Sequence, residues 1–436
     1  MSVRHIRALV AALLAAAVAA ALAPAAASAA KGNPWLTERF LNFAHQGGED
    51  ELPSNTMYAF KEAMKAGADA LELDVGYTSD GHLVVLHDNT LDRTTNGTGS
   101  VNDKTLAEVQ ALDAAYWFVP GRNAVHDQPA GAYPFRGVRT GQVPPPKGYT
   151  REDFRIPTLD EVLKAFPDTP INVEIKGRDG ADDAVFFRGA DLLADLLNRS
   201  GRTDVIVASF NQRAIDRFHA AAPQIGVAPG IDGMASFLLS NGSPGEGVVA
   251  FQIPITFKLG DTLLTVTSPD TVRRAHEAGY AVHVWLSNDT EDTATYDRLL
   301  DLCVDGIMAA RPKLLERTLV ARDVGTPGGH GFDPCGTKVA ASRVDLRGWK
   351  ATLPLERRGL SMERRSGTVT LTARRKTVGT ARFVLDAEAT ETSVKVKVNA
   401  TGRELLRGKR SVRVKATVQE RVPASQSYLR LRKPRR

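Results

Sequence analysis

Residues 67–88 read GADALELDVGYTSDGHLVVLHD and hold two strand candidates, 70–78 and 82–88. Residues two apart in a strand face the same side, so Glu72 and Asp74 share one face of the first run. Strand-length apolar runs of this kind recur along the chain, with helical patterns between them. Such a repeat indicates a parallel sheet covered by helices.

Seven further strand candidates surround this stretch: 40–45, 171–177, 204–210, 224–230, 248–255, 281–287 and 305–309. Helical patterns lie between them at 55–66, 158–165, 184–198, 212–221 and 269–278. Roughly eight β-then-α units favour an α/β fold with a closed TIM-type (β/α)8 barrel, and a doubly wound open sheet is the alternative. No GxGxxG and no GKS or GKT loop follows the first strand, so the usual nucleotide-binding forms of the open sheet have no support.

One segment interrupts the repeat. Residues 116–155 are rich in Pro, Gly and Arg and show no sustained period. Long segments without regular structure in compact domains are usually functional or mobile. The alternative is a solvated variable loop that does not contact the substrate.

The first 29 residues have the pattern of a secretory signal peptide. Arg4 and Arg7 precede an uncharged run of Ala, Leu and Val at 9–23, and small residues at 27–29 offer a cleavage site. No later stretch approaches the roughly 20 apolar residues that span a bilayer. We therefore expect a signal peptide at 1–29 and a secreted, extracellular protein, either free or associated with the cell envelope.

The net charge of +6 hides a division of the 436-residue chain. Residues 331–436 contain 26 Lys and Arg but 9 Asp and Glu, a net charge of +17, which leaves −11 for residues 1–330. A Gly- and Pro-rich join, GTPGGHGFDP (325–334), lies at this boundary. We expect the barrel at 30–325, a linker at 326–340 and a basic β-rich accessory domain at 341–436.

The strand signals after the join differ from those before it. Polar and apolar residues alternate at 368–377, 381–387, 392–400 and 411–418, with short polar turns between the runs. This pattern predicts a small all-β domain, an antiparallel sandwich.

Charged residues cluster where the first barrel strands end. Glu174 and Lys176 share a strand face as Glu72 and Asp74 do, so four charged groups would point into one cavity. Buried charges are unfavourable unless they are paired, so carboxylates in the mouth of a barrel imply a cation among them. Three carboxylates with no nearby Cys and no HxxxH pair suit one hard divalent cation, Ca²⁺ or Mg²⁺, better than zinc.

Short motifs surround these residues: HQG (45–47), LPSNTMYAF (52–60), LDRTTNGTG (91–99), VEIKG (173–177), HVWLSN (283–288) and DGIMAARP (305–312). Together with residues 67–88 they resemble the glycerophosphodiester phosphodiesterases, over about residues 40–320 of this chain. The resemblance implies a TIM-type barrel that hydrolyses glycerophosphodiesters to glycerol 3-phosphate and an alcohol. It also implies a divalent cation, commonly Ca²⁺ or Mg²⁺.

The resemblance assigns roles to individual residues. It implies a general acid/base pair, His45 and His87, and three metal ligands, Glu72, Asp74 and Glu174. Three further residues would bind substrate: Gln46 and Lys176 near the phosphate, and Trp285 at the glycerol site. Each histidine ends a strand, the position at which barrel enzymes carry catalytic groups. The sequence leaves open which histidine is the acid, and whether water or the substrate's own glycerol hydroxyl attacks phosphorus.

Gln46 departs from the family pattern, which usually has Arg at this position in contact with the phosphate. Charge-assisted hydrogen bonds are about twice as strong as neutral ones, so this change predicts weaker phosphate binding unless another cation compensates. The candidates for that cation are Arg93, Arg139 and Arg178. The usual PENT is PSNT (53–56), in which Asn55 suits a helix N-cap. Because the carboxylates and both histidines remain, we interpret the changes as altered specificity.

Three functions are compatible with these features. The leading one is hydrolysis of small glycerophosphodiesters. The second keeps the barrel but acts on glycerophosphate polymers of an envelope, or on lysophospholipids and sphingolipids in the manner of a phospholipase D. The third is a non-catalytic binding protein whose basic C-terminal domain holds an anionic envelope polymer or a lipid surface. No specific nucleic-acid partner is expected.

The chain has two cysteines, too few for a disulfide-rich scaffold. Cys303 lies just before the final predicted barrel strand and Cys335 just past the join. An oxidising compartment would allow a bridge between them that clamps the join. Two free thiols are the alternative.

Overall fold

The computed structural model describes residues 33–37, 40–177, 183–259, 262–286, 290–322, 324, 335–360, 364–420 and 425–433. The predicted signal peptide lies outside the described residues, as does most of the predicted linker. Within the described ranges, no helix is both long enough and apolar enough to cross a bilayer.

Eight parallel strands form the barrel: β1 (Leu41–Ala44), β2 (Ala70–Tyr77), β6 (Ile171–Ile175), β7 (Val205–Ala208), β8 (Gly226–Val227), β9 (Ala250–Pro254), β12 (Ala281–Trp285) and β13 (Gly306–Ala309). Consecutive strands are neighbours, and β13 pairs with β1. A parallel bridge between Val227 and Val248 joins the β8 and β9 segments and completes the ring. The TIM-type barrel is therefore confirmed, and the open sheet is excluded.

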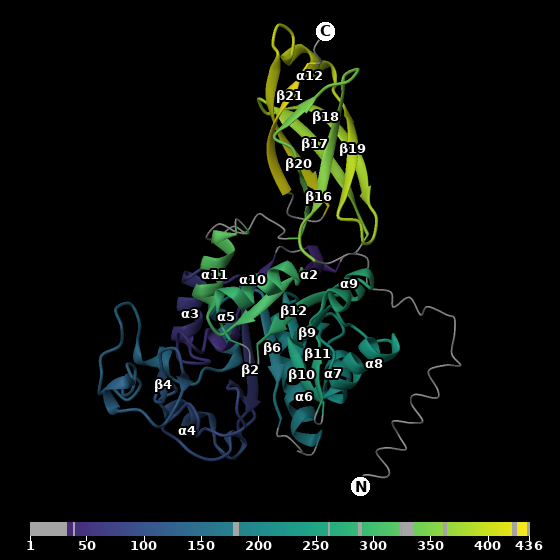
Figure 1. Cartoon of the computed structure of the whole chain (residues 1–436). Coiled ribbons are helices and arrows are strands. Elements are labelled where there is room, and N and C mark those ends of the chain that lie inside the picture. Colours follow the sequence, from purple (N-terminus) through teal and green to yellow (C-terminus); the bar gives the residue numbers. More distant parts are fainter. Residues whose placement is uncertain are drawn as a thin grey trace.

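Helices cover the outside of the barrel (Figure 1). They are α3 (Met57–Lys65), α5 (Leu159–Ala165), α6 (Asp183–Ser200), α7 (Gln212–Ala221), α8 (Ile231–Ser240), α9 (Pro269–Glu277), α10 (Thr293–Asp301) and α11 (Pro312–Ala321). All five predicted helical segments are among them. Polar N-caps start many of these helices, as the side chains of Asn211, Ser268 and Asp292 do for α7, α9 and α10.

The N-cap of α3 is Thr56, so the prediction that Asn55 caps this helix is wrong. The Thr56 hydroxyl accepts a hydrogen bond from the Ala59 amide. Asn55 instead has a left-handed backbone, with φ of 56°, and its amide donates to Asp74 Oδ2 at 3.3 Å. This backbone turn directs the Asn55 side chain toward the barrel interior rather than along the helix axis.

Strand alternation separates the two faces of the barrel wall. In β2, Leu71, Leu73 and Val75 pack in the cluster between strands and helices. The intervening residues Glu72 and Asp74 face the interior, where they are almost fully buried. Deeper in the interior, small and apolar side chains from many strands form a separate cluster that includes Phe43, Ala70, Ile206, Ala250, Ala281 and Met308. The polar residues therefore stand on a packed apolar floor.

The segment between β2 and α5 is ordered. Of the nine strand candidates before the join, 82–88 contains β3 (Leu83–Val85), which pairs antiparallel with β2 and does not join the barrel ring. The chain then forms α4 (Leu106–Ala111), β4 (Phe118–Val119) and β5 (Asn123–Ala124).

Residues 116–155 are anchored to the barrel by an aromatic cluster. The ring of Tyr58 in α3 contacts the rings of Phe135, Tyr149 and Phe154 at centroid distances of 4.7–5.1 Å. The prediction of a segment without regular structure holds for most of its length. Its side chains nevertheless share a buried cluster with the start of α3.

The C-terminal region is all-β, as predicted. Its strands are β14 (Thr337–Val339), β15 (Arg343–Asp345), β16 (Lys350–Arg357), β17 (Arg365–Ala373), β18 (Lys376–Leu385), β19 (Glu391–Lys397), β20 (Ser411–Gln419) and β21 (Ser425–Arg432). One sheet has the order β14-β16-β19 and the other β15-β21-β20-β17-β18, with one short helix, α12 (Ala400–Leu405). The pairs are antiparallel apart from β15 with β21. One hydrophobic cluster fills the space between the sheets.

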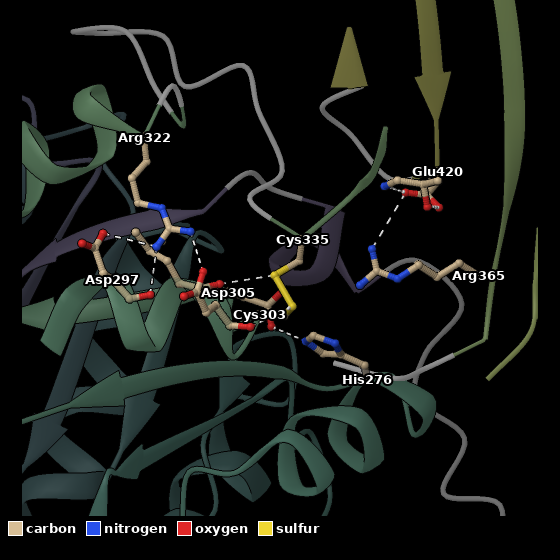
Figure 2. Close-up of a disulfide and its surroundings, with 11 residues drawn as sticks. His276, Asp297, Cys303, Asp305, Arg322, Cys335, Arg365 and Glu420 are labelled. Carbon is tan, nitrogen blue, oxygen red and sulfur yellow. Dashed lines mark hydrogen bonds and ion pairs between the residues drawn. A yellow bond between two sulfur atoms is a disulfide. The ribbon is translucent and has the colours of Figure 1, made fainter. Parts of the chain in front are cut away.

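A disulfide between Cys303 and Cys335 links the two regions (Figure 2). Cys303 follows α10 and precedes β13, so the bridge lies at the amino-terminal end of the barrel strands. Beside it, the Leu360 amide of the sandwich donates to the Asp301 carbonyl of the barrel at 2.6 Å. In Figure 1 the sandwich stands beyond this end of the barrel. The opposite ends of the strands carry the polar cluster.

Candidate active site

A tight turn after β1 shapes one side of the site. The turn is the 3-10 segment His45–Gly47, in which Gln46 has φ of 49° and Gly47 φ of 83°. A side chain at Gly47 would place its Cβ 2.8 Å from the Ala59 Cβ, so the turn requires glycine there. The backbone amide of Gln46 donates a hydrogen bond to Glu72 Oε2 at 3.0 Å and so holds that carboxylate toward the barrel axis.

Three predicted ligands meet in the structure. Asp74 on β2 is the direct cross-strand partner of Glu174 on β6, and Glu72 lies one pleat below on the same face. One oxygen from each of the three carboxylates lies within 4.8 Å of the others. Glu72 and Asp74 are 2% and 0% exposed. The cluster is thus positioned by strand register rather than by loops.

Lys176 supplies positive charge to this cluster. Its Nζ lies 3.0 Å from Asp74 Oδ1 and 2.9 Å from Glu174 Oε1. Burial lowers the pKa of Lys176, but the two carboxylates outweigh burial and raise it well above its usual range. Lys176 therefore remains charged, and its first contacts are carboxylates.

The pKa values of the carboxylates indicate that the charge of Lys176 does not neutralise the whole cluster. Burial, with the charges of Asp74 and Glu174, raises the pKa of Glu72 to about 8. Burial also acts on Asp74, yet the charge of Lys176 holds the pKa of Asp74 below its usual value. His45 is the cationic neighbour of Glu72, but burial outweighs its charge, so the pKa of Glu72 stays raised.

The residues fit a hard divalent cation. All three ligands are carboxylates, the oxygen donors that Ca²⁺ and Mg²⁺ prefer. Asp74 Oδ1 is buried and, among the described residues, accepts no hydrogen bond of good geometry, although Lys176 lies near it. A bound cation would offset the burial and the carboxylate repulsion that raise the pKa of Glu72.

His45 and His87 both border the same cavity, and each is held through Nδ1. Glu49 Oε1 lies 2.5 Å from His45 Nδ1, and Asp88 Oδ1 lies 2.6 Å from His87 Nδ1. A carboxylate on Nδ1 fixes the tautomer and leaves Nε2 for the substrate. His45 Nε2 lies 3.7 Å from Glu72 Oε2, so this imidazole adjoins the carboxylate cluster.

Neighbouring charges tune His45. Burial lowers its pKa, but the carboxylates of Glu49 and Glu72 outweigh burial and raise the pKa well above 6.5. Asp88 is stabilised as a carboxylate in a similar way. Burial raises its pKa, whereas hydrogen bonds from His87 and Arg93 hold the pKa well below the usual range.

Glu49 was not predicted from the sequence. The i, i+4 spacing of His45 and Glu49 is a weak signal, because these residues lie in a turn and not in a helix. The contact depends on the left-handed backbone at Gln46 and the next two glycines, which folds the chain back. Asn123, from the segment between β2 and α5, also borders the cavity and was not predicted.

The three candidate substitutes for the missing arginine differ in position. Arg93 borders the cavity, where its Nε lies 2.5 Å from Asp88 Oδ2. Arg139 instead donates to the Gln110 carbonyl and to Glu152, and does not border the cavity. Arg178 lies outside the described residues. Arg93 is therefore the candidate that the fold brings to the site.

Gln46 and Trp285 both line the cavity. Gln46 is 3% exposed, and its Oε1 accepts a hydrogen bond from the Ser54 hydroxyl at 2.7 Å. The usual Arg and the Glu of PENT are thus replaced by two neutral residues that contact each other. Trp285, at the end of β12, packs edge to face against Phe210 with ring centroids 6.0 Å apart.

Comparisons with known proteins match most of this chain to one family. The model of the glycerophosphoryl diester phosphodiesterase family matches residues 45–314. The glycerophosphodiester phosphodiesterase of Caldanaerobacter subterraneus subsp. tengcongensis is 31% identical over 279 residues, 63% of this chain and 96% of that protein. The Bacillus subtilis enzyme of the same name is 29% identical over 295 residues, 66% of this chain and 89% of that protein.

A solved Oleispira antarctica phosphodiesterase, in complex with the product sn-glycerol-3-phosphate, has a TM-score of 0.48 and 20% identity, covering 66% of this chain and 99% of that one. The family match spans more than half of the chain and begins at His45, the first residue of the cluster. This chain therefore belongs to the glycerophosphoryl diester phosphodiesterase family and is a glycerophosphodiester phosphodiesterase.

Proposed function

We propose that this enzyme hydrolyses small glycerophosphodiesters to glycerol 3-phosphate and an alcohol, using one divalent cation, Ca²⁺ or Mg²⁺, and the pair His45 and His87. One observation carries the proposal. Two imidazoles, each anchored through Nδ1 by its own carboxylate, border one cavity with three carboxylates that meet within 4.8 Å. These residues would hold a cation and would supply an acid and a base to one phosphate.

Glu72, Asp74 and Glu174 would hold the cation. When bound, a divalent cation neutralises charge on a non-bridging phosphate oxygen. Lys176, whose pKa is raised by its carboxylate neighbours, adds a second positive charge beside the phosphate. Arg93 lies at the same cavity, on the side of His87.

The histidines move the protons. One imidazole takes a proton from the attacking hydroxyl as its oxygen bonds to phosphorus. The other gives a proton to the departing alcohol oxygen as its bond to phosphorus breaks. Glu49 and Asp88 hold both rings through Nδ1, which leaves Nε2 of each ring for proton transfer in either role.

The test compares wild-type protein with His45→Ala and His87→Ala on glycerophosphocholine. We expect each variant to lose roughly 10²- to 10⁴-fold in kcat, the contribution of general acid/base catalysis, with its melting temperature retained. Chelation should abolish wild-type turnover, and Ca²⁺ or Mg²⁺ should restore it. Full activity in a protein shown by elemental analysis to contain no metal would contradict the metal assignment. A near-wild-type kcat in either variant would show that the substituted histidine is neither the acid nor the base.

For the C-terminal domain we propose an anchoring role, toward an anionic envelope polymer or lipid surface outside the cell. Its outer face carries a row of three exposed arginines in register across β15, β21 and β20: Arg343, Arg430 and Arg413. Like charges directly opposite in a sheet are destabilising, so such a row is explained best by an anionic ligand. The Arg413 guanidinium also lies over the exposed Tyr428 ring, 4.8 Å from its centroid.

A further inference from the structure

The cavity that holds the catalytic cluster extends past it along an apolar surface. The cavity has a volume of 480 Å³. Six side chains form what we call the apolar wall: Ile231, Met234, Leu238 and Leu239 of α8, Phe257 of β10 (Thr256–Leu259) and Leu264 of β11 (Thr262–Thr265). The helix follows the fifth barrel strand and the β10–β11 hairpin follows the sixth. The wall therefore lies across the barrel from β1, which His45 follows, and from β2, which carries Glu72.

Much of this wall is open to solvent. Leu239 is 76% exposed and Ile231 is 47% exposed, and Leu263, which adjoins the wall on β11, is 67% exposed. The described residues include ten large hydrophobic side chains that are exposed, and four of them line this one cavity. Single exposed hydrophobic residues are ordinary, whereas a group gathered at a cavity marks a binding surface.

The wall carries little charge. α8 contains one charged residue, Asp232, and the described residues of the hairpin contain one, Lys258. A glycerophosphate polymer would bring a negative charge with every repeat and would need cations along its path. An uncharged chain needs none, so the wall favours an apolar substituent over a polyanion.

The wall also connects directly to the reacting end. Phe210, itself half exposed, packs edge to face on Trp285, and both rings line the cavity; the Phe210 carbonyl accepts a hydrogen bond from the Ile231 amide at 3.1 Å, at the start of α8. The aromatic pair therefore adjoins the apolar wall within the same cavity as the carboxylate cluster. Cavities of roughly 300–1000 Å³ accept drug-sized ligands, so there is room beyond a small diester.

We infer that the substrates include glycerophosphodiesters that carry one acyl chain, with the phosphate at the carboxylate cluster and the chain along the apolar wall. This inference rests on the proposed function. The reaction is the same hydrolysis. An oxygen of water becomes bonded to phosphorus, the bond from phosphorus to the headgroup oxygen breaks, and a proton passes to that oxygen. The products are a monoacyl glycerophosphate and the headgroup alcohol.

The test uses a series of substrates in which only the chain changes. These are glycerophosphocholine and its 1-acyl derivatives with four, six and eight carbons, each kept below its critical micelle concentration. Burying a methylene raises affinity by up to about fourfold. We expect kcat/KM to rise at least about tenfold from the four- to the eight-carbon chain.

Variants of the wall separate its effect from catalysis. The double variant Leu239→Asn/Leu264→Asn should lose the rise with chain length and keep wild-type kcat/KM on glycerophosphocholine. Both side chains are exposed, so folding should survive, which a thermal melt checks. Val320→Asn is the matched control, because Val320 on α11 is also exposed but does not line the cavity. It should retain the full rise.

Three results would overturn the inference while leaving the proposed function intact, provided that glycerophosphocholine is hydrolysed. These are equal kcat/KM along the series, a rise that persists in the double variant, and activation that appears only above the critical micelle concentration. The last would show that the wall docks on a lipid surface and does not hold a single chain. Failure to hydrolyse any member of the series, including glycerophosphocholine, would instead refute the proposed function.

Discussion

Replacing Glu49 by Gln should lower the pKa of His45 while keeping a hydrogen-bonding side chain at its Nδ1. Glu49 Oε1 lies 2.5 Å from this nitrogen, and an opposite charge within about 4–6 Å typically changes a pKa by about 1–3, which is roughly a 10- to 1000-fold change in the protonation equilibrium. Glu72 stays in place with its Oε2 3.7 Å from His45 Nε2, so the pKa of His45 in the variant stays partly raised. The pKa of His45 should therefore fall toward its ordinary value without reaching it.

The assay is the pH dependence of kcat/KM on glycerophosphocholine at a fixed metal concentration. If His45 is the acid, the basic limb of the profile moves to lower pH, and the rate above that limb falls by at least about tenfold. If His45 is the base, the acidic limb moves to lower pH, and the rate below the wild-type limb rises because more of the imidazole is deprotonated. The limb that moves thus assigns the role of His45.

Glu51→Gln is the matched control, because the Glu51 carboxylate accepts a hydrogen bond from the Lys313 amide and makes no contact with His45 among the described interactions. It should leave both limbs in place. Superimposable profiles for wild type and Glu49→Gln would refute the view that Glu49 tunes His45.

The remaining predictions concern Gln46, the carboxylate cluster and the sandwich. Gln46→Arg combined with Ser54→Glu should lower KM for glycerophosphocholine more than Gln46→Arg alone. In the double variant the buried guanidinium pairs with a carboxylate at the position from which the Ser54 hydroxyl now donates to Gln46. Steady-state kinetics test this, and an equal or higher KM in the double variant would contradict the prediction. In metal-free protein the melting temperature should fall as the pH rises from 5 to 8, because the pKa of Glu72, raised from 4.5 to about 8, makes the folded state bind more protons than the unfolded state in this range. Glu72→Gln should flatten that slope, and an unchanged slope would argue against it. Arg413→Glu with Arg430→Glu should abolish sedimentation with anionic cell-wall material at low salt and leave kcat on glycerophosphocholine unchanged; equal sedimentation would remove the anchoring role.

Local alternation explains why much of the site could be predicted from the sequence. The period of residues 70–78 puts Glu72 and Asp74 on the face opposite Leu71 and Leu73, and the structure keeps that division. The meeting of Asp74 with Glu174 needed one further inference, that parallel strands align their carboxyl ends. The barrel topology then supplied the register.

Contacts between distant segments explain what could not be predicted. Tyr58 packs on Phe154, 96 residues later, and no pattern within residues 116–155 indicates a contact with Tyr58. The prediction that Asn55 is a helix N-cap was wrong because its left-handed backbone conformation is set by the turn before it and not by the helix after it. The apolar wall combines α8 with a hairpin from the next barrel connection, so its residues are not contiguous in the chain.

The Cys303–Cys335 disulfide closes a covalent ring that contains the whole join between the barrel and the sandwich. A protease that cuts the chain once between these residues would leave the two pieces connected through sulfur. Release of the basic sandwich would then take two events, a backbone cut and a reduction. After proteolysis, the barrel would thus lose its C-terminal domain only where the surroundings are reducing enough to break the disulfide.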